Sequence, residues 1–516
     1  MTSEKRQAEL QKRLAQRDKN QKRSHAYIYY LIVILTLVYI IDEIISNLQT
    51  NLMPEMVASI FPDLGLVAGS KKFGLVSGIA IAMMAFSMFY KPLADKFGRK
   101  PFLVLNTLGM GAAVALCTLA RNSGSFFVYW IGFFMLRFFV TPDEQVVYIF
   151  ETVNEKHRAT VYSLIKGVAE IGLVVIPLLR SLLFKVNLDG SGTESNPDNW
   201  RIIFLICAGI AFVVALFCLL FTKETDAFLD SRIAYLKKSD EELQAEKGFK
   251  NASKAQGGFF KSLAMVFQSK QLLFICIATA IYCAATSLVS YYSNLIENPI
   301  LEGFKTGIYA TEDAAQAAAT AQLNKALFIF PFTCGALTLV YGFLSDKFGR
   351  KKVAVALLSL VTIAFVLFIV GNRYGWSIYL LGALIGIFLA GYWGTGDTYI
   401  MMIGESSPTN MRASAITANS LFFGIGQGLS TVLIMLVPEK NPDLFCLFIS
   451  VPCFIISLAL IMIFVKETKG IKIEDAGKKL LEGKKNEDDK VEEVLIVEPS
   501  EENVEANSSE EEKEEK

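Results

Sequence analysis

Three ionisable residues, Asp42, Arg137 and Glu170, each stand within a long run of mostly apolar residues. An ionised side chain is costly to remove from water, and an apolar helix that retains one usually uses it to bind an ion, a proton or a polar solute. A carboxyl group beside an arginine in a medium of low dielectric gains or loses its proton as its exposure changes. We therefore predict that Asp42 or Glu170 binds a proton, and that protonation releases Arg137.

A second group of charges, Asp143, Glu144 and Lys166, lies nearer to one end of the same runs. Lys166 and Glu170 are four residues apart, so they share a helix face on which they can pair directly. The alternative for both groups is a structural role, in which buried salt bridges hold neighbouring helices together. Arg180 is close to the far end of its run, where we expect it to reach water.

These charges must be positioned by helices that cross a membrane. The chain has 516 residues, of which 53% are hydrophobic and 19% are charged, whereas about 25% are charged in soluble proteins. A helix needs about 20 apolar residues to cross a bilayer. The sequence therefore predicts an all-α membrane protein with twelve transmembrane helices, at 27–50, 73–93, 101–120, 125–150, 160–184, 200–222, 271–294, 323–344, 352–371, 376–404, 411–437 and 443–465.

Lysine and arginine concentrate in the N-terminal tail and in the loops at one end of these helices. Such loops face the cytoplasm, and an even number of spans places both termini on that side. Acidic residues without apolar periodicity fill the last part of the chain, which we expect to be disordered. The predicted divisions are a basic cytoplasmic N-terminal tail, a six-helix bundle, a cytoplasmic linker, a second six-helix bundle and an acidic cytoplasmic tail, at 1–26, 27–222, 223–270, 271–470 and 471–516.

One charged motif occurs twice, as Leu93–Lys100 and as Leu344–Lys351. An acidic residue, a glycine turn and a basic cluster cannot lie in hydrocarbon, so each copy must connect two helices at a water boundary. Two further pairs of similar segments follow in the same order in the two halves. Glu151 and Arg158 have the same spacing as Glu405 and Arg412, and Lys223-Glu224-Thr225 is repeated as Lys466-Glu467-Thr468. The two halves are therefore expected to be pseudo-symmetric, an arrangement typical of solute carriers.

At these motifs the chain resembles the major facilitator superfamily over nearly all of residues 27–470. Residues Gly342–Lys351 match the whole signature Gly-x-x-x-Asp-(Arg/Lys)-x-Gly-Arg-(Arg/Lys), whereas Lys91 replaces the first glycine in the first copy. The repeated acid–arginine pairs and Glu467-Thr468-Lys469-Gly470 are similar to the sugar-porter, organic-ion and metabolite–proton symporter branches. The hexose-binding pattern is absent, because Asp397 stands where a proline is expected in the tenth span.

The resemblance implies a gate built from the motif loops. Asp95 and Asp346 would cap the N-terminus of a neighbouring helix and pair with an arginine. Arg99 and Arg350 would then meet Glu151 and Glu405 when the cytoplasmic side is closed. The alternative is that the loop charges only set the topology. The residues assigned to the gate are Asp95, Gly98, Arg99, Glu151, Arg158, Gly342, Asp346, Gly349, Arg350, Glu405 and Arg412. Similar facilitators also place an acid on span one opposite an arginine on span four, here Asp42 and Arg137.

Aromatic and amide side chains of the second half are candidates for lining a substrate cavity between the two halves. An aromatic stripe is otherwise a packing surface, and that alternative stays open. The candidates are Asn294, Trp393, Asp397, Tyr399, Asn419 and Gln427.

Enzymatic function is not expected, because no nucleophile–base pair or phosphate-binding Gly-rich loop is present. The two histidines, His25 and His157, lie outside the predicted spans, and none of the eight cysteines has metal-ligand spacing, so we expect no metal and no cofactor.

We predict a monomeric secondary transporter that moves a small polar organic solute by alternating access, in symport with protons or, alternatively, Na⁺. Its expected partners are this solute, the coupling ion and the lipid bilayer, and no nucleic acid. Proton-coupled efflux of organic ions or drugs is a second hypothesis, and a nutrient receptor without transport is a third. The chain suits a plasma membrane, in particular a bacterial inner membrane.

Overall fold

The computed structural model describes residues 3–21, 26–140, 148–149, 151–153, 158–184, 196–237, 266–406 and 412–469, and within these ranges all regular structure is helical. Ten of the described helices are long and apolar enough to cross a membrane. The predicted second and seventh spans correspond to α4 (Leu66–Phe97) and to a chain of three shorter helices, α14 to α16. An all-α membrane protein is thus confirmed, and the structure is consistent with twelve spans.

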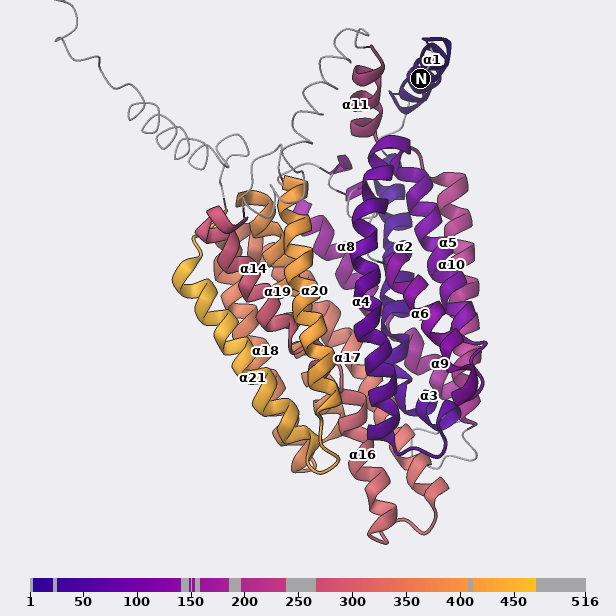
Figure 1. Ribbon diagram of the computed structural model, residues 1–516, viewed down its shortest axis with the longest axis vertical. Coiled ribbons are helices and arrows are strands. Elements are labelled where there is room, and N and C mark those ends of the chain that lie inside the picture. Colours follow the sequence, from indigo (N-terminus) through magenta and orange to yellow (C-terminus); the bar gives the residue numbers. More distant parts are fainter. Residues whose placement is uncertain are drawn as a thin grey trace, which may run out of the picture.

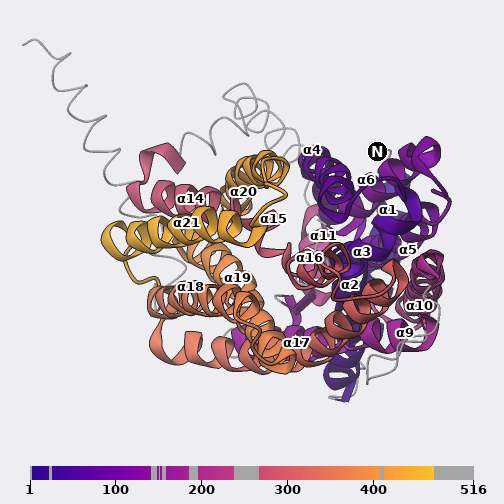
Figure 2. The same ribbon diagram turned by 90° about the horizontal axis from the view of Figure 1, so that it is seen from below.

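The first half contributes α2 (Ala26–Asn51), α4, α5 (Arg99–Cys117), α6 (Phe126–Val140), α8 (Arg158–Gly172), α9 (Val175–Leu183) and α10 (Trp200–Phe221). The second half contributes α14 (Lys270–Cys283), α15 (Thr286–Val289), α16 (Tyr292–Lys305), α17 (Glu312–Phe348), α18 (Arg350–Arg373), α19 (Ile378–Ser406), α20 (Arg412–Met435) and α21 (Pro442–Phe464). Figures 1 and 2 show the two groups of helices side by side. They meet where α8 packs on α17 and where α4 packs on α20.

Two predicted spans are not continuous helices. The fifth divides into α8 and α9, because Pro177 has no N–H to donate to the preceding turn and its ring would strike the carbonyl of Leu173. The seventh divides at α15, where the Thr286 hydroxyl donates to the carbonyl of Cys283 at 2.6 Å and so competes with the backbone ladder. Each break interrupts the helix within its predicted span.

Short helices cover the two ends of the molecule. At the end where Gly98 and Gly349 lie, hereafter the motif end, α1 (Ser3–Gln21) packs against α11 (Asp226–Lys237). Arg17 joins the two through Asp230, with Nε 2.6 Å from Oδ1. The N-terminal tail and the start of the linker, predicted only as polar segments, therefore include a docked helical pair. The opposite end carries α3 (Met53–Ile60) and the extension of α16 (Figure 1).

The opposite end is held together by hydrogen bonds between the halves. The Tyr292 hydroxyl donates to Asn51 Oδ1 at 2.5 Å, and the Ser293 hydroxyl donates to the Thr50 carbonyl at 2.9 Å. Tyr292, Ser293 and Asn51 are almost completely buried. These contacts close the space between α2 and α16 at that end.

Candidate functional site

A polar cavity of about 100 Å³ lies between the two halves. It receives side chains from α2, α4 and α6 of the first half, and from α15, α16 and α20 of the second. Its polar lining includes Gln49, Ser70, Arg137, Thr286, Asn294 and Gln427. Because the lining is mostly uncharged donors and acceptors, the cavity suits a solute with several hydroxyl, carbonyl or carboxylate groups.

Hydrogen bonds fix the orientation of these lining groups. Gln49 Nε2 donates to Ser77 Oγ at 3.0 Å, while its Oε1 accepts from the Tyr129 hydroxyl at 2.8 Å. Gln427 Nε2 donates to Thr286 Oγ1 at 3.0 Å. An amide held in this way keeps one geometry when a solute arrives, which lowers the entropy lost on binding.

Arg137 lines this cavity, with its guanidinium carbon 5.1 Å from the centre of the Phe133 ring. Asp42 lies one helical turn from the cavity residue Ser46, whose hydroxyl is 3.4 Å from Asp42 Oδ1. The Asp42 carboxylate is within electrostatic reach of Arg137. The two charges proposed from the sequence therefore lie at or next to the same cavity between the halves.

A second cluster of ionisable groups joins α8 to α17 and α19. Lys166 Nζ lies 2.6 Å from Asp397 Oδ2, and the same carboxylate accepts from Tyr341 at 2.9 Å and from Tyr162 at 3.2 Å. Lys166 thus pairs with Asp397 of the second half. It does not form the ion pair with Glu170 that their spacing in the sequence suggests. The reason is tertiary: α19 brings the Asp397 carboxylate, which also accepts from Tyr162 of α8 and Tyr341 of α17, to the Lys166 ammonium.

Glu170 is completely buried and also faces the second half. Its Oε2 accepts from the Thr338 hydroxyl and lies 3.3 Å from the thiol sulfur of Cys334, both on α17. Its Oε1 has no hydrogen-bond partner among the described residues. The neighbouring lysine, Lys166, is one turn away but is paired with Asp397. The Glu170 carboxyl is therefore positioned to hold a proton.

Only two of the six predicted cavity residues, Asn294 and Gln427, line the cavity. Asp397 belongs to the Lys166 cluster, and Tyr399 is buried towards α21, where its hydroxyl lies 2.9 Å from Ser457 Oγ. Trp393 packs on the hydrophobic core, and Asn419 is buried without lining the cavity. Successive residues of a helix point about 100° apart, and the sequence alone does not fix which direction faces the cavity. This is why the other four candidates lie elsewhere.

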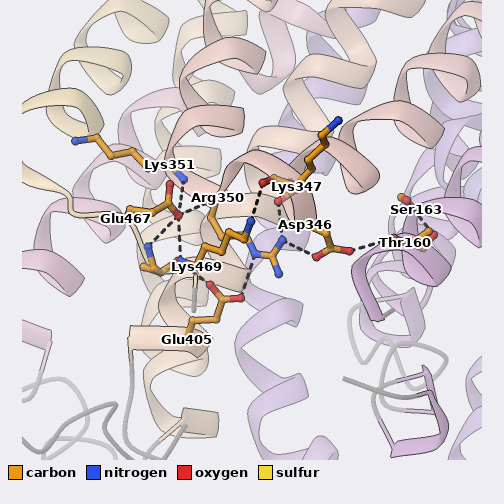
Figure 3. Close-up of polar contacts among 11 residues, drawn as sticks. Thr160, Ser163, Asp346, Lys347, Arg350, Lys351, Glu405, Glu467 and Lys469 are labelled. Carbon is orange, nitrogen blue, oxygen red and sulfur yellow. Dashed lines mark hydrogen bonds and ion pairs between the residues drawn. The ribbon is translucent and has the colours of Figure 1, made fainter. Parts of the chain in front are cut away.

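The second motif copy forms a connected network at the motif end (Figure 3). Arg350 bridges two acids, with Nε 3.1 Å from Glu405 Oε1 and Nη1 2.8 Å from Asp346 Oδ1. The other Asp346 oxygen accepts from Thr160 at 3.0 Å, in the first turn of α8 in the opposite half. Glu467 Oε1 accepts from the backbone nitrogen of Arg350 at 2.7 Å. This network therefore ties the two halves to each other.

The first copy repeats the same contacts within its half. Arg99 Nη2 lies 3.0 Å from Glu151 Oε1, and Glu224 Oε1 accepts from the Arg99 backbone nitrogen at 2.9 Å. Asp143 and Glu144 lie outside the described residues, as do the side chains of Asp95, Arg158 and Arg412. The repeat seen in the sequence is thus also a repeat of side-chain contacts.

Gly98 and Gly349 have φ values of +122° and +108°, which side chains of L-residues rarely adopt. A Cβ at either position would also overlap the carboxylate of Glu224 or Glu467. Both glycines are therefore required by backbone conformation, and the two carboxylates pack directly against them. Gly342, the first residue of the complete signature, is buried within α17.

The two glutamates that approach these glycines differ electrostatically. Burial raises the pKa of Glu224, although it accepts backbone N–H groups of Arg99 and Lys100. Glu467 is more exposed; its partial burial favours protonation, but backbone donors at Lys469, Arg350 and other positions outweigh this and hold its pKa below the usual value. The equivalent positions therefore respond to pH in opposite directions.

Arg180 does not reach water, contrary to our expectation. It is completely buried, its Nη1 donates to the Asn51 carbonyl, and it pairs with Glu55 on α3. Its Nη2 also lies 3.7 Å from Glu297 Oε1 on α16. In the sequence, Glu55, Arg180 and Glu297 each stand near the end of a different apolar segment. Only the packing of α3, α9 and α16 in the folded molecule shows that the three charges meet.

In the described residues no group of three or more histidine, cysteine, aspartate or glutamate side chains could hold a metal ion.

A family model described as Major Facilitator Superfamily matches residues 32–311 and 303–498. The chain belongs to the Major Facilitator Superfamily. The resemblance inferred from the motifs is confirmed, and the protein is a membrane carrier that works by alternating access, not an enzyme.

Solved structures of superfamily proteins show the same fold. A D-xylose–proton symporter is similar with a TM-score of 0.61 and 17% sequence identity, covering 86% of this chain and 99% of that chain. An inward-facing, unoccupied bacterial homologue of the human lysosomal transporter Spinster gives a TM-score of 0.52 at 15% identity, over 86% and 96% of the two chains. Protein ZINC INDUCED FACILITATOR 1 of Arabidopsis thaliana is 28% identical over 131 residues, which span a quarter of each chain.

Proposed function

We propose that this superfamily member is a proton-coupled symporter that binds a small polar organic solute in the central cavity. One observation carries the proposal: uncharged polar groups from both halves converge on a cavity whose cation, Arg137, lies within electrostatic reach of a buried carboxyl, Asp42. The similarity to a D-xylose–proton symporter supports the reaction class. A sugar or an organic acid has the hydrogen-bonding groups that this lining would satisfy.

Coupling would follow from competition for Arg137. While Asp42 is ionised, it attracts the guanidinium. When Asp42 takes up a proton, that attraction ends and Arg137 can donate to an oxygen of the solute instead. Proton and solute would then bind together more strongly than either binds alone, which is the thermodynamic requirement for symport.

Glu170 and Lys166 would form a second coupling element. In this structure Lys166 is paired with Asp397 of the other half, and separation of α8 from α19 must break that pair. Glu170 is four residues from Lys166 on the same helix and can then receive its ammonium. Because Glu170 must be ionised for that pairing, the exchange would release a proton as the halves move.

The remaining assignments accompany this proposal. The protein would be a monomer in a plasma membrane of bacterial inner-membrane type, with the motif end and both termini in the cytoplasm. Residues 27–222 and 271–470 would be the two bundles that rock, and the arginine–glutamate contacts at the motif end would hold the inward-closed state. That role extends to Asp95, Arg158 and Arg412 by their place in the repeat.

Proteoliposomes test the proposal directly. Purified protein is reconstituted, and uptake of a panel of sugars and organic acids is measured with an inward proton gradient, an inward Na⁺ gradient or no gradient. We expect one class of polar solute to accumulate with the proton gradient only. Accumulation driven by Na⁺, or solute exit driven by proton entry, would contradict proton symport.

Asp42→Asn separates coupling from binding. The variant should lose accumulation driven by the proton gradient, yet it should keep exchange of labelled for unlabelled solute, because exchange needs no net proton movement. A variant that accumulates solute with the pH dependence of the wild type would show that Asp42 is not the proton site. Tyr399→Phe, which removes a buried hydroxyl away from the cavity, is the matched control and should behave as wild type.

A further inference from the structure

Glu55, Arg180 and Glu297, hereafter the Arg180 cluster, place one guanidinium and two carboxyl groups in a buried site at the end opposite to the motifs. Arg180 and Glu297 are completely buried and Glu55 is 3% exposed. Glu55 and Arg180 belong to the first half, whereas Glu297 belongs to the second. The cluster therefore lies on the boundary at which the halves must separate.

The charges of the cluster do not balance if both carboxyl groups are ionised. Two carboxyl groups that share one cation in a buried site retain a proton, because the second negative charge would have no compensation. Glu297 is the less well-paired of the two: its Oε1 lies 3.7 Å from Arg180 Nη2, beyond hydrogen-bonding distance, whereas the Glu55 carboxylate is in direct contact with the same nitrogen. Its carboxyl is thus the group that carries the proton.

Among the described residues, no charge from α17, α3 or α4, the helices that pack on α16, acts on Glu297 apart from those of the cluster. Its electrostatic partners are Glu55 on α3 and Arg180 on α9. From α4 the nearest contact of α16 is uncharged, a hydrogen bond from Asn294 to Ser70 at 2.7 Å. The neighbouring Tyr292 hydroxyl donates to Asn51 and so does not neutralise the carboxylate. The proton count of the cluster is set by its own three members.

We propose that the Arg180 cluster is a further proton-binding site, in which Glu297 is protonated while the opposite end is closed and releases that proton when this end opens. Opening carries Glu297 away with α16 and into water, while Glu55 and Arg180 remain paired within the first half. One proton leaves the Glu297 carboxyl on opening and returns on closing. The proton comes from and goes to the same side, so this site senses pH and does not add to the transported protons.

The sign of the pH effect follows from linkage. The closed state binds one proton more than the open state, so acid favours closure and alkali favours opening at this end. Where Glu297 is protonated only in the closed state, the ratio of open to closed molecules rises up to tenfold per pH unit. This inference needs only alternating access, and it holds whatever solute or ion the carrier couples.

Distance measurements across the opposite end test this inference. Spin labels are attached to the exposed positions Leu64 and Ile308, which belong to the first and second halves respectively, in the full-length protein in nanodiscs. We expect the open fraction of the wild type to rise between pH 5 and pH 8. Glu297→Gln, a neutral copy of the protonated group, should stay as closed as the wild type is in acid, with no pH dependence.

Two controls make the result decisive. Asp63→Asn should keep the pH-dependent opening, because Asp63 is an exposed acid between α3 and α4 and is not part of the cluster. Glu55→Gln leaves one carboxylate for one guanidinium, so Glu297 should ionise in the closed state and the pH dependence should be lost as well. A wild-type pH dependence in Glu297→Gln would overturn the proposal, even if proton-coupled transport were established.

Infrared difference spectroscopy provides a readout that does not depend on the variant being active. In the closed state, the wild type should show a carbonyl band of a protonated buried carboxylic acid that is missing from Glu297→Gln, while any band from Glu170 or Asp42 is present in both. If that replacement prevents folding, Glu55→Gln should remove the same band. A band that persists in whichever variant folds would show that the proton resides elsewhere.

Discussion

Glu224 Oε1 accepts a hydrogen bond from the backbone nitrogen of Arg99 at 2.9 Å, and so it caps the first turn of α5. Glu467 caps α18 in the same way through Arg350, at 2.7 Å. Free backbone N–H groups at a helix N-terminus favour a negative charge. The same device therefore stabilises the motif loop in each half, but with different degrees of burial.

We predict opposite responses when these two caps are neutralised. For Glu467 the folded pKa is below the usual value of 4.5, so its stabilising effect is present above that pH and is lost as the pH falls through the folded pKa. Glu467→Gln should therefore lower the melting temperature at pH 7, by the equivalent of about 1 kcal/mol, and the difference should disappear in acid. Thermal unfolding in detergent at several pH values measures both effects.

Glu224→Gln is the matched comparison. Burial raises the pKa of Glu224 above 4.5, so the folded protein binds more protons than the unfolded chain, and this contribution to stability is lost as the pH rises through the folded pKa. At pH 7 the glutamine removes the cost of a buried charge and keeps an oxygen acceptor. Its melting temperature should equal or exceed that of the wild type. A drop as large as that of Glu467→Gln would contradict this difference between the caps.

Alanine at Gly349 should destabilise the second motif loop. The substitution forces a side chain into a backbone with φ of +108° and into the Glu467 carboxylate, at a cost of about 1–3 kcal/mol. Gly98→Ala should behave alike. Gly209→Ala, inside α10 with open space around it, is the control and should be neutral or slightly stabilising. Melting temperatures of the three variants, compared with the wild type, test the prediction.

Asp346→Asn should weaken the contact between the halves at the motif end. It removes the ion pair with Arg350 and weakens the acceptor for Thr160. Thr160→Val removes only the hydrogen bond between the halves. It should therefore shift the equilibrium less than Asp346→Asn does, and change the ratio of open to closed molecules by a factor of about 2–10. Spin-label distances across the motif end report the open fraction. Unchanged populations in both variants would exclude a gating role for this contact.

Gln427→Leu should weaken solute binding. It keeps the approximate size of the side chain but removes the donor to Thr286 and the polar surface that faces the cavity. We expect KM to rise about 2–10-fold, because each lost hydrogen bond to a solute costs about 0.5–1.5 kcal/mol. Asn419→Leu, buried outside the cavity, is the comparison. An equal change of KM in both variants would argue against this cavity as the binding site.

The sequence by itself determined those properties that depend on neighbours along the chain. Runs of apolar residues are sufficient to predict membrane helices, because each helix satisfies its own backbone hydrogen bonds in lipid. The repeated motifs identified two related halves and the superfamily. They also named the pairs Arg99–Glu151 and Arg350–Glu405, which the structure contains.

Only the tertiary structure decided which charges meet. Lys166 pairs with Asp397 and not with Glu170, and Arg180 is buried between Glu55 and Glu297 rather than exposed. Hydropathy gives the position of a residue along a helix, but the rotation of each helix and its distance from its neighbours follow from packing over the whole molecule. The bends at Pro177 and Thr286 then set which faces meet, and a sequence pattern that assumes straight helices cannot place them.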